Sequence, residues 1–232
     1  MNTSPVCFFL PTRKGSERVI NKNTRPFAGI NGGLLETKLR QLSKCSELDE
    51  IILSTNDAIC AEVAERSISD SRFRIVWRPD ELCQSSTNLQ DLIRYVPTIT
   101  TAEHILWGHV TTPLAGATQY DDAIKLYRGK LQEGYDSLVG VCELRNFLLN
   151  KQGAIINNTT NIAWPRTQDL EIIYEINHTI FLASRAIYLE QGNRLGTKPF
   201  LFNMNKINSF DVDWEEDFQI AETLYKQYAG TL

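Results

Sequence analysis

Several features that define whole classes of protein are missing from this sequence. No apolar run approaches the roughly 20 residues that a helix needs to cross a bilayer. The first residues lead directly into an apolar, strand-like segment and lack the pattern of a signal peptide. These absences predict a soluble protein of the cytoplasm with no membrane partner.

An excess of positive charge is missing as well. The chain carries 24 lysines and arginines against 28 aspartates and glutamates, which gives a formal net charge of −4. No overall positive field therefore attracts nucleic acid or an anionic membrane. We predict no nucleic-acid partner, and any anion-binding site must be formed locally by a few residues.

Cysteine pairs with the spacing of metal or redox motifs are also absent. The five cysteines are odd in number and widely spaced, and none forms a Cys-x-x-Cys pair. Several lie in apolar stretches, where cysteine behaves as a small hydrophobic residue. We predict reduced thiols at all five positions: Cys7, Cys45, Cys60, Cys83 and Cys142.

A regular alternation of strand-like and helix-like segments fills the first part of the chain. Apolar runs predict strands, and apolar residues at helical spacing predict the helices between them. Such alternation predicts an α/β fold with a Rossmann-like, mainly parallel sheet flanked by helices. The predicted strands are 6–10, 50–54, 73–77, 104–108 and 136–143, and the helices lie near 35–42, 57–63, 89–96 and 120–131.

The pattern loosens between about residues 145 and 176, where a polar cluster precedes Trp164 and Pro165. We predict an excursion from the sheet here. The chain then returns through a strand at 178–183, a helix at 185–191 and a strand that ends at Asp211, before a last helix with an apolar stripe. No linker or internal repeat divides residues 1–232, which we interpret as a single domain.

The loop that follows the first predicted strand is rich in positive charge. Its cations surround one glycine, and a turn glycine with exposed amides can form an anion nest. Each charge-assisted hydrogen bond contributes about 1.5 to 3 kcal/mol, so several cations here would dominate the binding of a nucleoside triphosphate. A solvated turn is the alternative, but ligands of such sheets bind at the carboxyl ends of strands. The loop is neither a Walker A motif nor a dinucleotide fingerprint, and its cations are Arg13, Lys14, Arg18 and Lys22.

Two aspartates near the end of the chain predict a metal site. Asp211 and Asp213 are two residues apart on the predicted strand, so both carboxylates face one side. Magnesium prefers oxygen ligands and keeps positions for water and substrate phosphate. The alternative is that Asp213 caps the last helix with Glu216 in a capping box, which leaves Asp211 without a role.

The cationic loop resembles the amino-terminal signature of a known family. Its Arg-x-Gly-Ser-x-Arg pattern, followed by Lys-Asn, is similar to that of the acylneuraminate cytidylyltransferases, the CMP-sugar synthetases acting on sialic, legionaminic, pseudaminic and related nonulosonic acids. Later segments resemble further motifs of this family in the same order, and together they span nearly the whole chain. These segments are 78–82, 111–114, 166–170, 211–213 and 216–218.

The resemblance implies a nucleotide-diphospho-sugar transferase fold of the GT-A-like type and a homodimer in which the excursion at 145–176 completes the neighbouring active site. It implies transfer of CMP from CTP to the anomeric hydroxyl of a 2-keto sugar acid, with release of pyrophosphate, for lipopolysaccharide or capsule biosynthesis. The implied catalytic residues are Arg13, Lys22 and Asp211, and the implied Mg²⁺ ligands are Asp211 and Asp213. The implied nucleotide-binding residues are Leu10, Arg13, Gly15, Ser16, Arg18, Lys22, Asn23 and Arg78; the sugar-binding residues are His109, Thr111, Arg166 and Gln168.

Some positions depart from the pattern of this family near the expected sugar pocket. His109 and Val110 stand where many relatives have glutamine and proline, Ala115 replaces an arginine, and Ser85 replaces an aspartate. The identity of the sugar acid therefore stays open. Three alternative identities also stay open: a sugar-phosphate nucleotidyltransferase using another nucleotide, a metal-dependent glycosyltransferase, and a noncatalytic nucleotide-binding protein.

Overall fold

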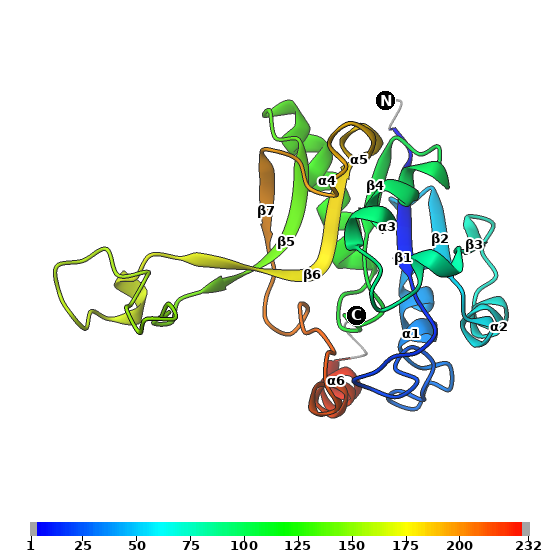
Figure 1. The fold of residues 1–232 in the computed structure, drawn as a ribbon, viewed down its shortest axis with the longest axis horizontal. Coiled ribbons are helices and arrows are strands. Elements are labelled where there is room, and N and C mark those ends of the chain that lie inside the picture. Colours follow the sequence, from blue (N-terminus) through cyan, green and yellow to red (C-terminus); the bar gives the residue numbers. More distant parts are fainter. Residues whose placement is uncertain (1–3, 229–232) are drawn as a thin grey trace.

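A seven-stranded sheet forms the centre of the computed structural model, which describes residues 4–228 (Figure 1). The strand order is β3-β2-β1-β4-β6-β5-β7, and every neighbouring pair is parallel except the two that involve β6. The mainly parallel α/β sheet predicted from the sequence is confirmed. The strands are β1 (Val6–Pro11), β2 (Glu50–Thr55), β3 (Phe73–Trp77), β4 (His104–Trp107), β5 (Ser137–Leu144), β6 (Ile173–Ser184) and β7 (Pro199–Asn203).

Helices cover both faces of this sheet. The larger core contains buried residues of β1 and β2 and of helices α1 (Gly33–Leu42), α2 (Ala58–Ser67), α4 (Ala117–Gln132) and α6 (Glu215–Tyr228). The smaller core lies on the opposite face against α3 (Leu89–Tyr95) and α5 (Arg185–Gln191). Short 3-10 turns occupy Asp80–Leu82, Val96–Thr98 and Thr167–Asp169.

The central strand β1 is apolar because both of its faces are covered by helices. Phe8 packs on Tyr120 of α4, and Phe9 packs on Trp107 of β4 from the other face. All five cysteines are buried and unpaired, as predicted. None of the helices between residues 4 and 228 is both long and apolar enough to span a membrane.

The last strand ends earlier than the sequence predicts. We expected it to reach Asp211, but β7 ends at Asn203 and an irregular segment leads to α6. The side chain of Asn205 accepts hydrogen bonds from the backbone of Ile207 and Asn208, which forms a turn that competes with the sheet. Asp211 therefore does not lie on a strand, and that prediction is wrong.

Strand β6 begins earlier than the sequence predicts. It starts at Ile173 rather than at residue 178, and its first residues pair with the end of β5 outside the body of the protein. These residues are largely exposed, so they lack the one-sided apolar pattern that identifies a half-buried strand. They form the base of an arm, defined here as residues 145–176, that projects from the sheet (Figure 1).

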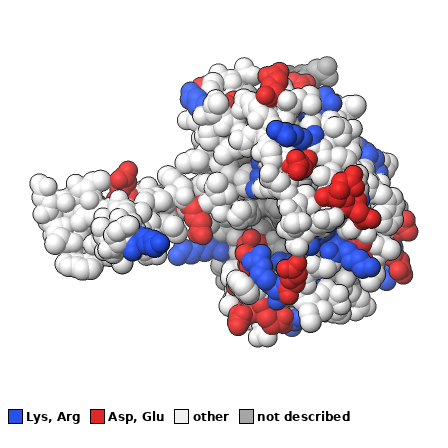
Figure 2. All heavy atoms as spheres, in the orientation of Figure 1, with Lys and Arg blue, Asp and Glu red and all other residues white. Residues whose placement is uncertain are grey.

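The arm presents apolar side chains to solvent. Trp164 is 73% exposed and Ile162 is 63% exposed. Its visible surface is mostly uncharged compared with the body of the protein (Figure 2). Large exposed apolar patches are typical of interaction sites, and the arm carries several large exposed apolar residues.

Candidate functional site

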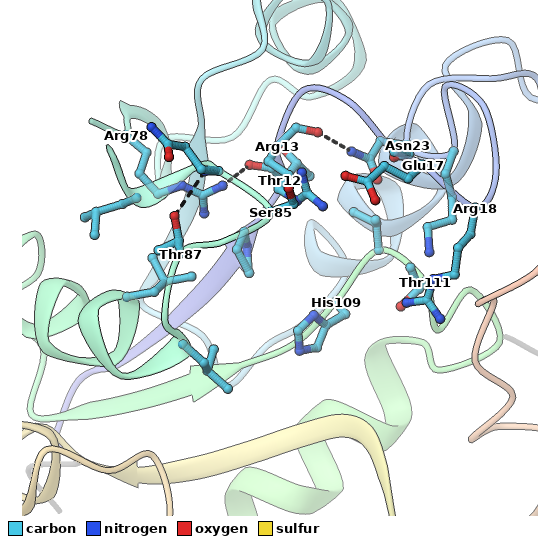
Figure 3. A pocket seen from close by; sticks show the side chains of 18 of the residues that line it. Thr12, Arg13, Glu17, Arg18, Asn23, Arg78, Ser85, Thr87, His109 and Thr111 are labelled. Atoms are coloured by element: carbon cyan, nitrogen blue, oxygen red, sulfur yellow. Dashed lines mark hydrogen bonds between the residues drawn. The ribbon is translucent and has the colours of Figure 1, made fainter. Parts of the chain in front are cut away.

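A pocket of about 570 Å³ opens at the carboxyl ends of β1 and β4. It is bounded by the loop after β1, by the segment between β3 and α3, and by the residues that follow β4. Figure 3 places Arg78 and Thr87 at one end, Arg18 and Thr111 at the other, and His109 between them. The pocket therefore lies where a sheet of this type binds its ligand.

Hydrogen bonds that involve its backbone hold the loop after β1. The Thr12 amide donates to the carbonyl of Ser54 (2.9 Å), and the Asn23 side chain donates to the carbonyl of Arg13 (3.3 Å). Gly15 has φ +83°, a left-handed conformation that other residues rarely adopt. Arg13, Ser16 and residues near them line the pocket.

Arg78 lies beneath this loop and is buried. Its Nη2 donates to the carbonyl of Thr12 (2.5 Å) and its Nε to the sulfur of Cys83 (3.0 Å). Its buried Nη1 has no hydrogen-bond partner among the described residues. Arg78 thus supports the loop and retains one donor beside the pocket.

The cationic loop meets the carboxyl-terminal segment next to the pocket. The Nζ of Lys22 donates to the carbonyl of Val212 (2.9 Å), and Arg18 forms an ion pair with Asp213 (3.0 Å). The amide of Val212 donates to the carbonyl of Thr111 after β4 (2.8 Å). Burial lowers the pKa of Lys22, whereas the nearby carboxylates oppose that shift. Three segments far apart in the sequence therefore converge at one place.

The two aspartates differ in environment. Burial raises the pKa of Asp211, and its buried Oδ1 has no hydrogen-bond partner within residues 4–228. Asp213 is half-exposed and paired with Arg18. The backbone amides of Asp213 and Trp214 donate to the carboxylate of Asp217, so Asp217 caps α6. The alternative capping box of Asp213 with Glu216 is therefore not observed.

These aspartates offer the donor set that Mg²⁺ prefers. Both provide carboxylate oxygens, and the Oδ1 of Asp211 has no competing hydrogen bond from a described residue. No group of three or more His, Cys, Asp or Glu residues suited to a metal occurs in the described chain. The pair fits an ion that takes its remaining ligands from water and substrate phosphate.

The three histidines have different surroundings. His104 lies in the core, where its Nδ1 is 3.1 Å from the hydroxyl of Tyr127. His109 lines the pocket, and burial followed by the nearby Arg194 lowers its pKa to about 3. His178 has φ +58° at an irregularity in the pairing of β5 and β6, and bulges of this kind often redirect a side chain near a site.

Some of the residues predicted for the site lie elsewhere. Leu10 is fully buried in the core, and the pocket begins at Pro11. Arg166 and Gln168 lie on the arm, away from the pocket of the same chain, and Arg166 pairs with Asp169 (2.8 Å). Gly15 shapes the loop without lining the pocket. Arg13, Ser16, Arg18, Lys22, Asn23, Arg78, His109 and Thr111 do line it, and Asp211 and Asp213 lie beside it.

Sequence reasoning missed part of the pocket wall. Beyond the 78–82 motif and Ser85, the segment between β3 and α3 and the start of α3 contribute residues that no motif identified. One signal in the sequence could have marked where this segment ends. Asn88 caps α3 by accepting a hydrogen bond from the Gln90 amide (3.0 Å), and asparagine is a common residue just before the first turn of a helix. The missed residues are Gln84, Thr87, Asn88, Leu89 and Leu92.

Comparison with known proteins gives one family. The family model described as cytidylyltransferase matches residues 7–230. N-acylneuraminate cytidylyltransferase of Escherichia coli O18:K1:H7 is 25% identical over 228 residues, which cover 94% of this chain and 51% of that protein. Pseudaminic acid cytidylyltransferase of Campylobacter jejuni strain 81-176 is 24% identical over 224 residues, covering 94% of each. The chain spans about half the length of the N-acylneuraminate relatives.

Solved structures share the fold at low sequence identity. CMP:2-keto-3-deoxy-manno-octonic acid synthetase in complex with CTP aligns with a TM-score of 0.67 at 11% identity, covering 97% of this chain and 99% of that one. The 4-diphosphocytidyl-2C-methyl-D-erythritol synthase of Anaerococcus prevotii aligns with a TM-score of 0.65 at 13% identity, covering 97% and 96%. The fold is therefore that of known nucleotidyltransferases.

Proposed function

The chain belongs to the cytidylyltransferase family, and from this premise we propose that it transfers CMP from CTP to the anomeric hydroxyl of an acidic 2-keto sugar. The oxygen of that hydroxyl bonds to the α-phosphorus and gives up its proton to solvent, the bond from the α-phosphorus to the bridging oxygen breaks, and pyrophosphate leaves. The sugar class comes from the names of the relatives, which act on N-acylneuraminate and pseudaminic acid. One observation carries the proposal: Lys22 joins the cationic loop to the segment of Asp211 and Asp213 beside a single pocket.

The residues of the loop suit a triphosphate. Phosphoryl transfer depends mainly on positioning and on neutralising charge, and little covalent chemistry is asked of the protein. Arg13, Arg18 and Lys22 supply three cations at one edge of the pocket, and the Ser16 hydroxyl lies among them. Arg78 supports the loop through the Thr12 carbonyl, and in this proposal its Nη1, which has no hydrogen-bond partner among the described residues, serves the nucleoside end.

Asp211 and Asp213 would hold Mg²⁺ in this proposal. When bound, the ion would neutralise negative charge that develops on the phosphate oxygens. The two side chains are positioned by the protein itself, because Val212 between them is fixed by hydrogen bonds to Lys22 and Thr111. Arg18 holds Asp213 through its ion pair, so the site is arranged before any ligand binds.

We also propose a homodimer formed through the arm. The arm displays exposed apolar residues that a second copy of the chain would cover. Arg166 and Gln168 lie on this arm, so their predicted contact with the sugar would occur in the site of the second copy. The proposal rests on this placement and on the family resemblance.

The direct test is pyrophosphate release. The protein is incubated with Mg²⁺ and with CTP, UTP, GTP or ATP, together with N-acetylneuraminic, pseudaminic or 2-keto-3-deoxy-manno-octonic acid. We expect release with CTP and at least one of the acids. Release with another nucleotide and none with CTP would show a different nucleotidyltransferase, and no release with any combination would favour a noncatalytic protein.

A further inference from the structure

Asn56 is the first residue after β2, and its side chain joins two loops at the carboxyl edge of the sheet. Its Oδ1 accepts a hydrogen bond from the backbone amide of Lys14 in the cationic loop (3.1 Å). Its Nδ2 donates to the Oδ1 of Asp80, which follows β3 (3.1 Å). The segments that follow β1, β2 and β3 are therefore linked in series by one side-chain amide.

The chemistry of the two neighbours determines how this amide is oriented. An ionised carboxylate accepts hydrogen bonds and has no proton to donate, so Asp80 pairs with the NH₂ group of Asn56. That pairing turns the amide oxygen towards the backbone N–H of Lys14, which is a donor. Asparagine satisfies both neighbours at once. Aspartate at the same position would keep the acceptor for Lys14 but would place a second carboxylate against Asp80.

The amide of Lys14 is the last point at which the loop is fixed before its exposed turn. Among the described residues, the backbone of residues 14–17 makes one other hydrogen bond, in which the Arg13 side chain donates to the carbonyl of Gly15 (3.4 Å). Ser16 follows this turn and lines the pocket. The position of the turn relative to the pocket therefore depends on the bond to Asn56.

The segment after β3 thus supports the cationic loop at two points. Arg78 acts directly on the carbonyl of Thr12, and Asp80 acts through Asn56 on the amide of Lys14. Lys14 and Asp80 are exposed, so water competes for the bonds at this second point and they contribute little to the stability of the fold. Their main effect is on where the loop lies.

We propose that Asn56 is a positioning residue that holds the cationic loop in the geometry that binds a triphosphate, and that Asp80 acts through it. This inference rests on the proposed function. A loop that is anchored in advance loses less conformational freedom when a ligand binds, so loss of the anchor weakens binding although no ligand contact is removed. The loop is assigned to the phosphates and Arg78 to the nucleoside, so the loss should be larger for CTP than for CMP.

The test exchanges the two side chains. Asn56→Asp removes the donor, and adding Asp80→Asn supplies an NH₂ group from the opposite side. CTP and CMP are titrated calorimetrically with Mg²⁺ and without any sugar acid, so that no transfer occurs, into wild type, both single variants and the double variant. The control is Asn193→Asp, because Asn193 also accepts a backbone amide, that of Leu195 (3.3 Å), but lies outside the pocket between α5 and β7. Melting temperatures confirm that each variant is folded.

We expect Asn56→Asp to weaken CTP binding about tenfold and CMP binding less than about threefold, because a hydrogen bond is lost and two carboxylates oppose each other. Asp80→Asn should stay within about twofold of wild type, since its side-chain oxygen still accepts, and the double variant should return to within about twofold. Asn193→Asp should match wild type. A pure effect of charge would instead make Asp80→Asn bind CTP more tightly by the factor that Asn56→Asp loses, which would overturn the assignment.

Three further outcomes would overturn it: CTP binding by folded Asn56→Asp that equals wild type, equal losses for CTP and CMP, and a double variant that binds CTP as weakly as Asn56→Asp. Wild-type protein that binds neither nucleotide would do the same. CTP binding that depends on Asn56 as expected, without pyrophosphate release with any of the acids, would contradict the proposed function alone.

Discussion

At the scale of single residues, the site is held by contacts weak enough for a ligand to replace. Arg18 and Asp213 form an ion pair in which the side chains are 50% and 47% exposed. Exposed pairs of this kind contribute only about 0 to 1 kcal/mol, whereas a charge-assisted bond to phosphate contributes about 1.5 to 3 kcal/mol. A triphosphate therefore competes successfully for Arg18. The ion pair orients Asp213 without preventing binding.

Lys22 and Lys14 provide a matched pair within the same loop. Lys22 donates to the carbonyl of Val212, whereas the exposed Lys14 is fixed through its backbone amide to Asn56. We expect Lys22→Gln to lower kcat/KM for CTP by about 100-fold, because it removes a preorganised charge. Lys14→Gln should change it less than about threefold. Steady-state pyrophosphate assays measure both, and similar losses in the two variants would contradict a specific role for Lys22.

Asp211 should show opposite effects on activity and stability. Burial raises its pKa, so ionisation is less favourable in the folded state than in the unfolded state. As the pH rises from below its unfolded pKa through its folded pKa, this carboxyl lowers the stability of the protein. Asp211→Asn removes that contribution and, in the proposed mechanism, also removes a metal ligand.

Without metal at pH 7, we therefore expect Asp211→Asn to melt at the same temperature as wild type or at a higher one. With Mg²⁺, we expect its turnover to be lower than that of wild type by about 100-fold or more. Thermal denaturation and pyrophosphate release measure the two effects. Full turnover in this variant would refute the proposed metal site. A large fall in the melting temperature of Asp211→Asn would contradict the claim that the buried, ionised Asp211 carboxylate lowers the stability of the protein.

At the scale of the elements, helix α1 fixes the loop that follows β4 through one buried lysine. The Nζ of Lys38 donates to the carbonyls of Thr112 and Ala115 (2.8 Å each) and to the hydroxyl of Tyr120 (2.7 Å). The loop it holds also contains Thr111, whose carbonyl accepts from Val212. Through this loop, Lys38 of the core helix α1 helps to position the carboxyl-terminal segment.

Lys38→Met should destabilise the protein. It leaves three buried acceptors without their donor, and we expect a loss of about 3 kcal/mol at pH 7. Burial lowers the pKa of Lys38 to about 7, below its unfolded value, so its contribution to stability increases between about pH 7 and pH 10. The difference between wild type and variant should therefore widen in that range.

Urea unfolding at pH 7 and pH 9 measures this difference. Lys44→Met is the control, because Lys44 is exposed just beyond the end of α1 and should change stability by less than about 0.5 kcal/mol. If Lys38→Met were as stable as wild type, the three hydrogen bonds would contribute nothing to the free energy of unfolding, and the prediction would be contradicted.

At the scale of the whole molecule, the arm determines what a second copy can contribute. Its base is the paired ends of β5 and β6, which leave the sheet together. The body contains the pocket, the cationic loop and both aspartates. In the proposed dimer, Arg166 would therefore contribute to the site of the other chain.

We expect the protein to sediment as a dimer, and we expect Ile162→Ser with Trp164→Ser to sediment as a monomer with an unchanged core. Trp164 packs on Phe147 within the arm (ring centroids 5.2 Å apart), so its substitution could also disturb the structure of the arm. Ile162→Ser alone keeps this contact and therefore tests the interface separately. Leu189→Ser is the control, because Leu189 is 56% exposed on α5 in the body. Sedimentation velocity distinguishes the states, and monomeric wild-type protein would contradict the proposed assembly.

The sequence by itself determined the order and type of nearly all strands and helices, because apolar periodicity is a local property of the chain. It also identified the cationic loop, since the carboxyl end of a buried parallel strand is where such a sheet binds ligands. Arg13 and Lys22 were found in this way and Arg78 through the family resemblance, and all three line the pocket.

The tertiary structure alone decided where distant segments meet. Lys22 and Val212 are 190 residues apart, and no periodicity in the sequence indicates that they are hydrogen-bonded. The turn at Asn205 removed Asp211 from a strand, and the arm carried Arg166 away from the pocket of its own chain. Contacts between distant residues depend on how the whole sheet assembles, so local sequence patterns do not encode them.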